Sequence, residues 1–249
     1  PLSRYWPRMF VDGLRHGNIG DMATGFLNMS KAPMDIFREL LLRNNKHDER
    51  IIKKFADHIN STSEPFFDFI HLNGVHNPYN PHIKFYNSFG DASYLTLRDT
   101  IKYQKKLIEN RPLLAADKRQ FDHTYDAEIK NLYSGAIRQI DKNIEFIFNI
   151  LEKNDYLKDT IVVIFGDHGD HLGENNLWGH QFSVRDELIR VPLLIRDPTD
   201  NFDAGCRKDI VQTHDIYDTI VNIFGAGNSP QSSIDVREGD RETAFTYYY

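Results

Sequence analysis

Residues 160–174 read TIVVIFGDHGDHLGE, an apolar and β-branched run followed at once by acidic and imidazole side chains. The run at 160–165 predicts a buried β-strand, and Asp167 and His168 follow it directly. In open α/β sheets, ligands bind in the crevice beyond the carboxyl ends of the strands, which is where this pair would lie. We therefore expect Asp167 and His168 to hold a cation that faces a substrate.

The two side chains offer a hard oxygen and a borderline nitrogen, a mixture that suits Mn, Zn or Mg. Two further histidines are candidates for the same site. His180 ends the sequence LWGH at 177–180, and His76 lies within HLNGVHNPY at 71–79. Each follows a strand-like or glycine-containing segment, where a loop allows an imidazole to face a cleft instead of a core.

Helix and strand patterns alternate along the rest of the chain. Apolar residues at helical spacing predict helices at 47–60, 97–110, 125–153 and 211–224, and short apolar runs predict strands at 65–72 and 191–195. Strands that are continuously apolar are typical of sheets covered on both faces. The fold class expected is therefore α/β, with a largely parallel sheet and helices on both faces.

The composition limits the class of protein. The chain is 40% hydrophobic and 27% charged, which predicts a globular protein. Its length permits one α/β domain over 1–249 or one large domain with a small appendage, and the less regular, charged region at 80–122 is interpreted as a helical insertion. A net charge of −6 argues against nucleic acid or an anionic membrane as the main partner. The single cysteine, Cys206, excludes an intrachain disulfide. No apolar run has transmembrane length and no signal segment is recognisable within the chain, so localisation stays open.

Several of these motifs occur in an order that resembles the sulfatase (arylsulfatase-like) family of the alkaline phosphatase superfamily. They are PFF at 65–67, HNPY at 76–79, DTIVVIFGDHGDHLGE at 159–174, GH at 179–180 and RVPLLI at 190–195. The resemblance covers roughly residues 65–246, and the first 60 or so residues match only loosely. The sequence DHGDHLGE at 167–174 is its most specific part.

The resemblance implies an alkaline-phosphatase-like fold and a metal-dependent sulfuric ester hydrolase. One divalent ion would be bound by Asp167 and His168. Calcium is usual where the second ligand is Asn or Asp, and His168 shifts the preference toward Mn, Mg or Zn. His76 and His180 would be the catalytic histidines, one protonating the leaving oxygen and the other binding the sulfuryl oxygens. Which histidine has which role stays open.

One departure from the family concerns the nucleophile. The family uses a Cys or Ser in Cys/Ser-x-Pro-x-Arg, converted to formylglycine, and early aspartates that complete the metal site. Here Cys206 is followed by Arg207 and Ser3 by Arg4, so neither position fits. We expect a formylglycine nucleophile upstream of this chain and a domain incomplete at its N-terminus. The isolated chain would then carry half of the metal site and be inactive.

Two other readings stay open. Phosphodiesterases, phosphonate hydrolases and phosphoglycerol transferases of the same superfamily share the Asp-His pair, so the substrate is a sulfate or a phosphate ester. A non-catalytic binding module is the third hypothesis, and the oligomeric state is open. Among the remaining candidates, His171 and Glu174 are weaker, Asp170 is interpreted as a solvated loop carboxylate and His214 as a structural histidine.

Overall fold

The structure is a computed structural model that describes residues 46–120, 122–225, 233–239 and 241–246. The described residues divide into two compact units, one within 1–109 and 122–147 and the other within 110–121 and 148–249. Two long helices, α6 (Tyr94–Ala115) and α7 (Asp126–Lys153), each contribute to both units. No helix within the described ranges combines the length and apolar character that a membrane crossing needs.

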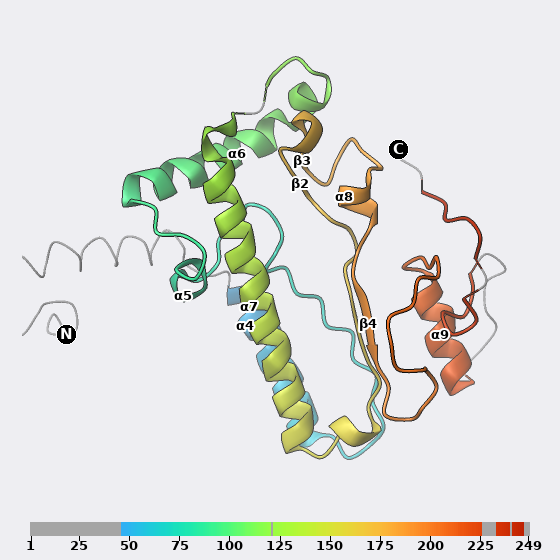
Figure 1. The fold of residues 1–249 in the computed structure, drawn as a ribbon. Coiled ribbons are helices and arrows are strands. Elements are labelled where there is room, and N and C mark those ends of the chain that lie inside the picture. Colours follow the sequence, from blue (N-terminus) through green and yellow to red (C-terminus); the bar gives the residue numbers. More distant parts are fainter. Residues whose placement is uncertain (1–45, 121, 226–232, 240, 247–249) are drawn as a thin grey trace, which may run out of the picture. The chain divides into compact units, whose positions relative to one another are not determined.

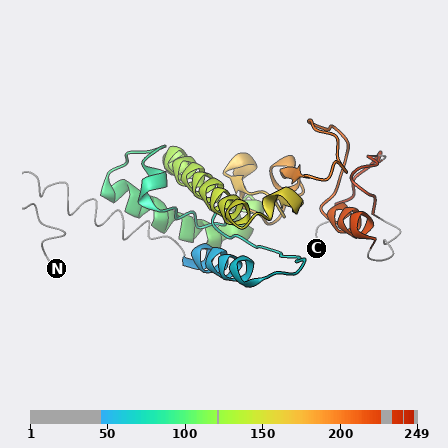
Figure 2. The same cartoon turned by 90° about the horizontal axis from the view of Figure 1, so that it is seen from below.

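The first unit is helical. It contains α4 (Lys46–Ser61), α5 (Ile83–Tyr86), the 3-10 turn η2 (His123–Tyr125) and the larger parts of α6 and α7, and α4 runs alongside α7 (Figure 1, Figure 2). The core forms where apolar residues recur every three or four positions and so share one helix face. Its buried members include Phe55, Ile59, Tyr79, Tyr86, Leu97, Leu107, Ile129, Leu132 and Ala136.

Helix α7 confirms the helix expected at 125–153. Asp126 and Glu128 lie in its first turn, where negative charge is favoured by the helix dipole. At the other end, the Asn154 side chain donates to the carbonyl of Ile150 at 2.8 Å. Asp155 then takes a left-handed φ of 62°, which stops the helix. The helices expected at 47–60 and 97–110 also form, with slightly wider bounds.

The strand expected at 65–72 does not form within the described residues. The segment carries no strand assignment, and Phe67 and Phe69 are 74% and 71% exposed. A strand needs a neighbour to accept its backbone hydrogen bonds, and no described strand pairs with this segment. Its apolar run is therefore extended but unpaired.

The second unit contains two antiparallel pairs of strands. Strand β1 (Val162–Phe165) pairs with β4 (Leu193–Arg196), in a register that places Val162 opposite Arg196 and Phe165 opposite Leu193. Strand β2 (His171–Leu172) pairs with β3 (Trp178–Gly179). The described residues thus contain no parallel pair, contrary to the largely parallel sheet expected. Continuous apolar character does not determine strand direction, and β1, expected to be buried, is only half-buried within the described residues. The link between β1 and β4 is the β2–β3 hairpin and the short helix α8 (Asp186–Ile189), not a long crossover helix, and it returns the chain in the opposite direction.

Helix α9 (Asp215–Phe224) covers one part of this sheet, because Ile216 and Ile220 share an apolar pocket with Val163 and Ile195. The helix begins four residues later than the expected start at 211. Two 3-10 turns complete the unit, η3 (Leu157–Asp159) and η4 (Glu174–Asn176).

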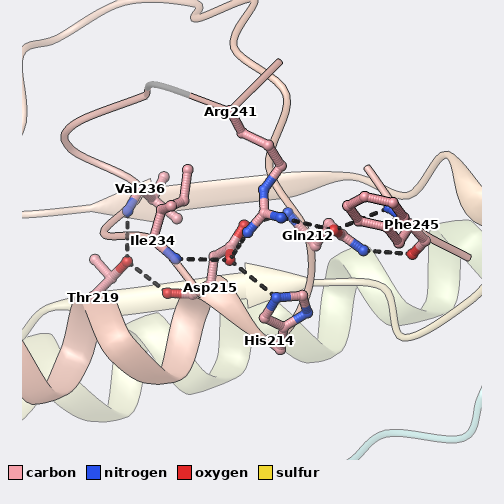
Figure 3. Close-up of polar contacts among 8 residues, drawn as sticks. All are labelled: Gln212, His214, Asp215, Thr219, Ile234, Val236, Arg241 and Phe245. Carbon is pink, nitrogen blue, oxygen red and sulfur yellow. Dashed lines mark hydrogen bonds and ion pairs between the residues drawn. The ribbon is translucent and has the colours of Figure 1, made fainter. Parts of the chain in front are cut away.

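A buried carboxylate ties the C-terminal segment to α9 (Figure 3). Asp215 is fully buried and pairs with Arg241 at 2.5 Å, while its two oxygens also accept the backbone N–H groups of Gln212 and Ile234. His214 Nε2 lies 3.3 Å from the same carboxylate, which agrees with a structural histidine. The Gln212 side chain both donates to the carbonyl of Phe245 and accepts from its N–H, as a neighbouring strand would.

Candidate active site

Asp167 and His168 lie in the turn that follows β1. The turn is fixed at both ends, because Gly166 donates to the carbonyl of Pro192 at 3.1 Å and Gly169 donates to that of Leu188 at 2.8 Å. Only glycine fits at 169, since a Cβ atom there would collide with the carbonyl oxygen of Glu187. The two site residues therefore project from a rigid turn at the end of a strand.

Both side chains are accessible. The carboxylate of Asp167 is 64% exposed and the imidazole of His168 39%. The Nδ1 of His168 lies 2.8 Å from the carbonyl of Gly169. Because a carbonyl only accepts, Nδ1 carries the hydrogen and the lone pair is on Nε2.

The distance between the two donor atoms tests whether one ion fits. The Nε2 of His168 lies 3.9 Å from Oδ2 of Asp167. Two ligands of one ion, each about 2.1 Å away from it, cannot be more than about 4.2 Å apart. The separation is therefore within the upper limit for two ligands of one divalent ion. Within the described residues, His168 also lies close to Asp170 and His180, with one ligand atom of each within 4.8 Å of the others.

His180 reaches this cluster through the β2–β3 hairpin. The register pairs His171 with Gly179 and Leu172 with Trp178, so Asp170 and His180 flank the paired residues on opposite strands. The imidazole Nδ1 of His180 lies 3.1 Å from Oδ1 of Asp170, and the ring centroids of His168 and His180 are 4.3 Å apart. The structure thus brings three residues of the predicted region together, namely Asp167, His168 and His180.

Asp170 was misinterpreted from sequence as a solvated loop carboxylate. Its side chain is only 6% exposed and lies against His180. The local sequence favours a turn, and the partner is ten positions away. The signal that could have identified the contact is the pairing of 170 with 180 in a short hairpin, which requires knowing the register.

His76 lies in the other compact unit, so its place beside the metal ligands stays a prediction. Its own loop is well defined. The N–H of His76 donates to the carbonyl of Asn73, and its Nδ1 lies 2.7 Å from the carbonyl of Asn77. The buried amide of Gln104 accepts from the N–H of Tyr79 at 2.7 Å and donates to its carbonyl at 3.3 Å, which clamps the end of the loop.

Glu174 and His171, the two weaker candidates, have contacts that are typical of structural residues. Glu174 accepts the backbone N–H of Leu172 at 2.5 Å. His171 is fully buried, and within the described residues neither ring nitrogen has a hydrogen-bond partner. Burial lowers the pKa of His171, with the carboxylates of Glu187 and Glu174 opposing the shift. His171 is therefore a neutral core residue on the face of the hairpin opposite to Asp170.

The lowered pKa of His171 predicts a pH-dependent stability. Below the ordinary histidine pKa near 6.5, His171 takes up a proton in the unfolded chain but stays neutral in the folded protein. The stability that neutral His171 contributes is therefore complete above pH 6.5 and is lost as the pH falls from there toward the folded pKa. The stability difference between wild type and His171→Leu should change by at most about 1.4 kcal/mol per pH unit in that window. Urea unfolding between about pH 5.5 and 7.5 measures it. A difference that is constant with pH would show that the pKa of His171 is not lowered.

Comparison with known proteins points to one family. A family model described as Sulfatase matches residues 10–226. The choline-sulfatase of Rhizobium meliloti is 26% identical over 154 residues, which cover 60% of this chain and 30% of that protein. The "multifunctional alkaline phosphatase superfamily protein PehA" of Trinickia caryophylli is 29% identical over 106 residues, which cover 42% of this chain and 20% of that protein. The chain thus spans less than a third of the length of these two relatives.

A solved structure shows the same fold. The putative sulfatase YidJ of Bacteroides fragilis superposes with a TM-score of 0.59 at 21% identity, over 77% of this chain and 40% of that one. The similarity supports the alkaline-phosphatase-like α/β class expected from sequence, of which the described residues contain the helices and a few strands.

Proposed function

Because the chain belongs to the sulfatase family of the alkaline phosphatase superfamily, we propose that it supplies metal ligands and catalytic histidines to a metal-dependent sulfuric ester hydrolase. The choline-sulfatase and the putative sulfatase YidJ are sulfatases by name, and each is much longer than the part that matches. The activity is therefore proposed for the full-length gene product that contains these residues.

The observation that carries the proposal is the arrangement of Asp167 and His168. Their donor atoms are 3.9 Å apart, both side chains are accessible, and the hydrogen bond at Nδ1 leaves the lone pair of His168 on Nε2. A bound divalent ion would polarise the non-bridging oxygens of the ester and lower the pKa of the attacking group. Mg or Mn suits this mixed oxygen and nitrogen pair, and Ca is the third ion that we propose to test.

Of the two histidines, one would protonate the leaving oxygen and the other would bind a sulfuryl oxygen. In His180, the Nδ1 atom faces Asp170, so Nε2 is the atom that would reach the ester, either to protonate the leaving oxygen or to bind a sulfuryl oxygen. His76 would take the other role, and its Nδ1 is likewise directed to an acceptor, the carbonyl of Asn77. A formylglycine nucleophile belongs to the proposal, although the sequence contains no Cys/Ser-x-Pro-x-Arg motif.

A phosphoryl-transfer function is the second candidate. An Asp-His metal pair stabilises the oxygens of a phosphate ester by the same Lewis-acid effect. The similarity to PehA, which is described as multifunctional, favours testing both classes of ester.

The test compares esters that share one leaving group. We expect the purified full-length gene product to hydrolyse para-nitrophenyl sulfate with a higher kcat/KM than para-nitrophenyl phosphate or bis-para-nitrophenyl phosphate, and to lose that activity with a chelator. Activity should return with added Mg, Mn or Ca. A preference for either phosphate ester would replace the proposal by the second candidate. Turnover of none of the three would support a non-catalytic module or a substrate with other recognition groups, and a metal-content measurement would then separate these two.

A further inference from the structure

The contact between Asp170 and His180 at the candidate site is more shielded from solvent than two similar Asp–His contacts elsewhere. The side chains are 6% and 22% exposed, and the Oδ1–Nδ1 distance is 3.1 Å. Elsewhere in the described residues, His58–Asp68 and His123–Asp126 have the same kind of contact at 3.0 Å, but their imidazoles are 44% and 68% exposed. Solvent competes with a contact at the surface and much less with one that is enclosed.

The hairpin places these two residues opposite each other by its register. Side chains directly opposite in an antiparallel pair lie on the same face, and the next pair along lies on the other face. The pair His171–Gly179 puts His171 into the core, so Asp170 and His180 lie on the opposite face of the hairpin. Gly179 has a φ of 73°, and a Cβ atom there would lie within 3.0 Å of the buried guanidinium of Arg111. The backbone just before His180 is therefore held in one conformation.

The contact also determines which ring nitrogen carries hydrogen. A carboxylate only accepts, so a neutral His180 has its hydrogen on Nδ1 and its lone pair on Nε2. The ring of His180 lies over that of His168 at 4.3 Å, with 33° between the planes. Without the carboxylate, the ring could rotate about its bonds and exchange the positions of its two nitrogens.

We propose that Asp170 is a positioning residue, which acts on the ester through His180 by fixing its orientation and tautomer. This inference rests on the proposed function, because it assigns Nε2 of His180 to the reacting ester. It assigns no direct contact with metal or substrate to Asp170. Loss of a carboxylate that hydrogen-bonds the second nitrogen of a functional histidine commonly lowers activity by about 10–100-fold.

The variant Asp170→Asn tests the proposal in the full-length gene product. We expect kcat for para-nitrophenyl sulfate to fall by about 10–100-fold, with KM changed less than about twofold and the metal content unchanged. The matched control, Asp68→Asn, breaks the exposed contact with His58 and should leave kcat at the wild-type value. Loss of the metal from Asp170→Asn would make Asp170 a ligand, and unchanged kcat would remove any role; either result overturns the proposal.

A double-mutant cycle tests whether the effect passes through His180. If it does, Asp170→Asn should lower kcat little further in a His180→Ala background, because the group that it positions is absent. Equal losses in both backgrounds would overturn the proposal. Thermal unfolding of each variant near the wild-type midpoint ensures that the comparison concerns folded protein.

A measurement that does not depend on catalysis distinguishes the positioning of His180 from the proposed sulfatase activity. The ring-nitrogen NMR signals of His180, identified by their loss in His180→Ala, should show hydrogen on Nδ1 in wild type and a shifted tautomer population in Asp170→Asn. If the wild type hydrolyses no sulfate ester but shows this change, the proposed function fails and the positioning of His180 stands. Identical signals in wild type and Asp170→Asn overturn the positioning whatever the activity.

Discussion

Replacement of Asp167 by alanine is expected to lower kcat/KM of the full-length gene product by about a thousandfold or more and to remove its bound metal. Metal ions contribute several kcal/mol of transition-state stabilisation, and about 1.4 kcal/mol corresponds to a tenfold change in rate. With Asp167 gone, His168 is left as the sole member of the pair and the negative charge that attracts the ion is lost. The fold should tolerate the change, since the side chain is 64% exposed.

The measurements are kcat/KM with para-nitrophenyl sulfate and metal content by elemental analysis. Asp155→Asn is the matched control. Asp155 is an exposed carboxylate that ends α7 at a φ of 62°, and asparagine adopts this left-handed conformation readily. The control should keep both metal and activity. If Asp167→Ala retained its metal and lost less than about tenfold in kcat/KM, the Asp-His pair would not be the metal centre.

The position of the candidate metal pair in the turn after β1 could be predicted from sequence because it depends on local rules. A β-branched run predicts a strand, and residues just after a strand in an α/β protein face the ligand crevice. The structure places Asp167 and His168 in that turn, with Nε2 of His168 3.9 Å from Oδ2 of Asp167. The helix at 125–153 was equally predictable, since its apolar residues recur with the helical period over many turns.

Features that depend on partners distant in sequence could not be predicted. The antiparallel pairing of β1 with β4 follows from the path of the link between them, which apolar character does not encode. Ile137 fits the apolar face of α7 by spacing but is 47% exposed, because spacing does not tell how wide the covered face is. The contact of Asp170 with His180 required the hairpin register, and the segment at 65–72 lacked the neighbour that its strand pattern implied.

Stability is expected to depend most on another carboxylate, Asp215. The variant Asp215→Ala should lower the free energy of unfolding by about 3–5 kcal/mol, because it leaves the guanidinium of Arg241 without its buried counter-charge. The Arg241 side chain is 10% exposed and that of Asp215 is fully buried. The same change removes the acceptor of two backbone N–H groups, those of Gln212 and Ile234. The segment at 233–246 should therefore detach from α9 before the rest of the unit unfolds.

The contrast with an exposed pair makes this prediction decisive. Arg138 and Asp141 form an ion pair at 3.1 Å whose side chains are 62% and 64% exposed, so Asp141→Ala should cost less than about 1 kcal/mol. Urea unfolding of the two variants and wild type gives both free energies, and limited proteolysis reports release of the C-terminal segment. Equal losses for Asp215→Ala and Asp141→Ala would mean that water reaches the Asp215–Arg241 contact. A loss for Asp215→Ala alone, accompanied by cleavage near 233–246, would show that one buried carboxylate holds this segment on the helix.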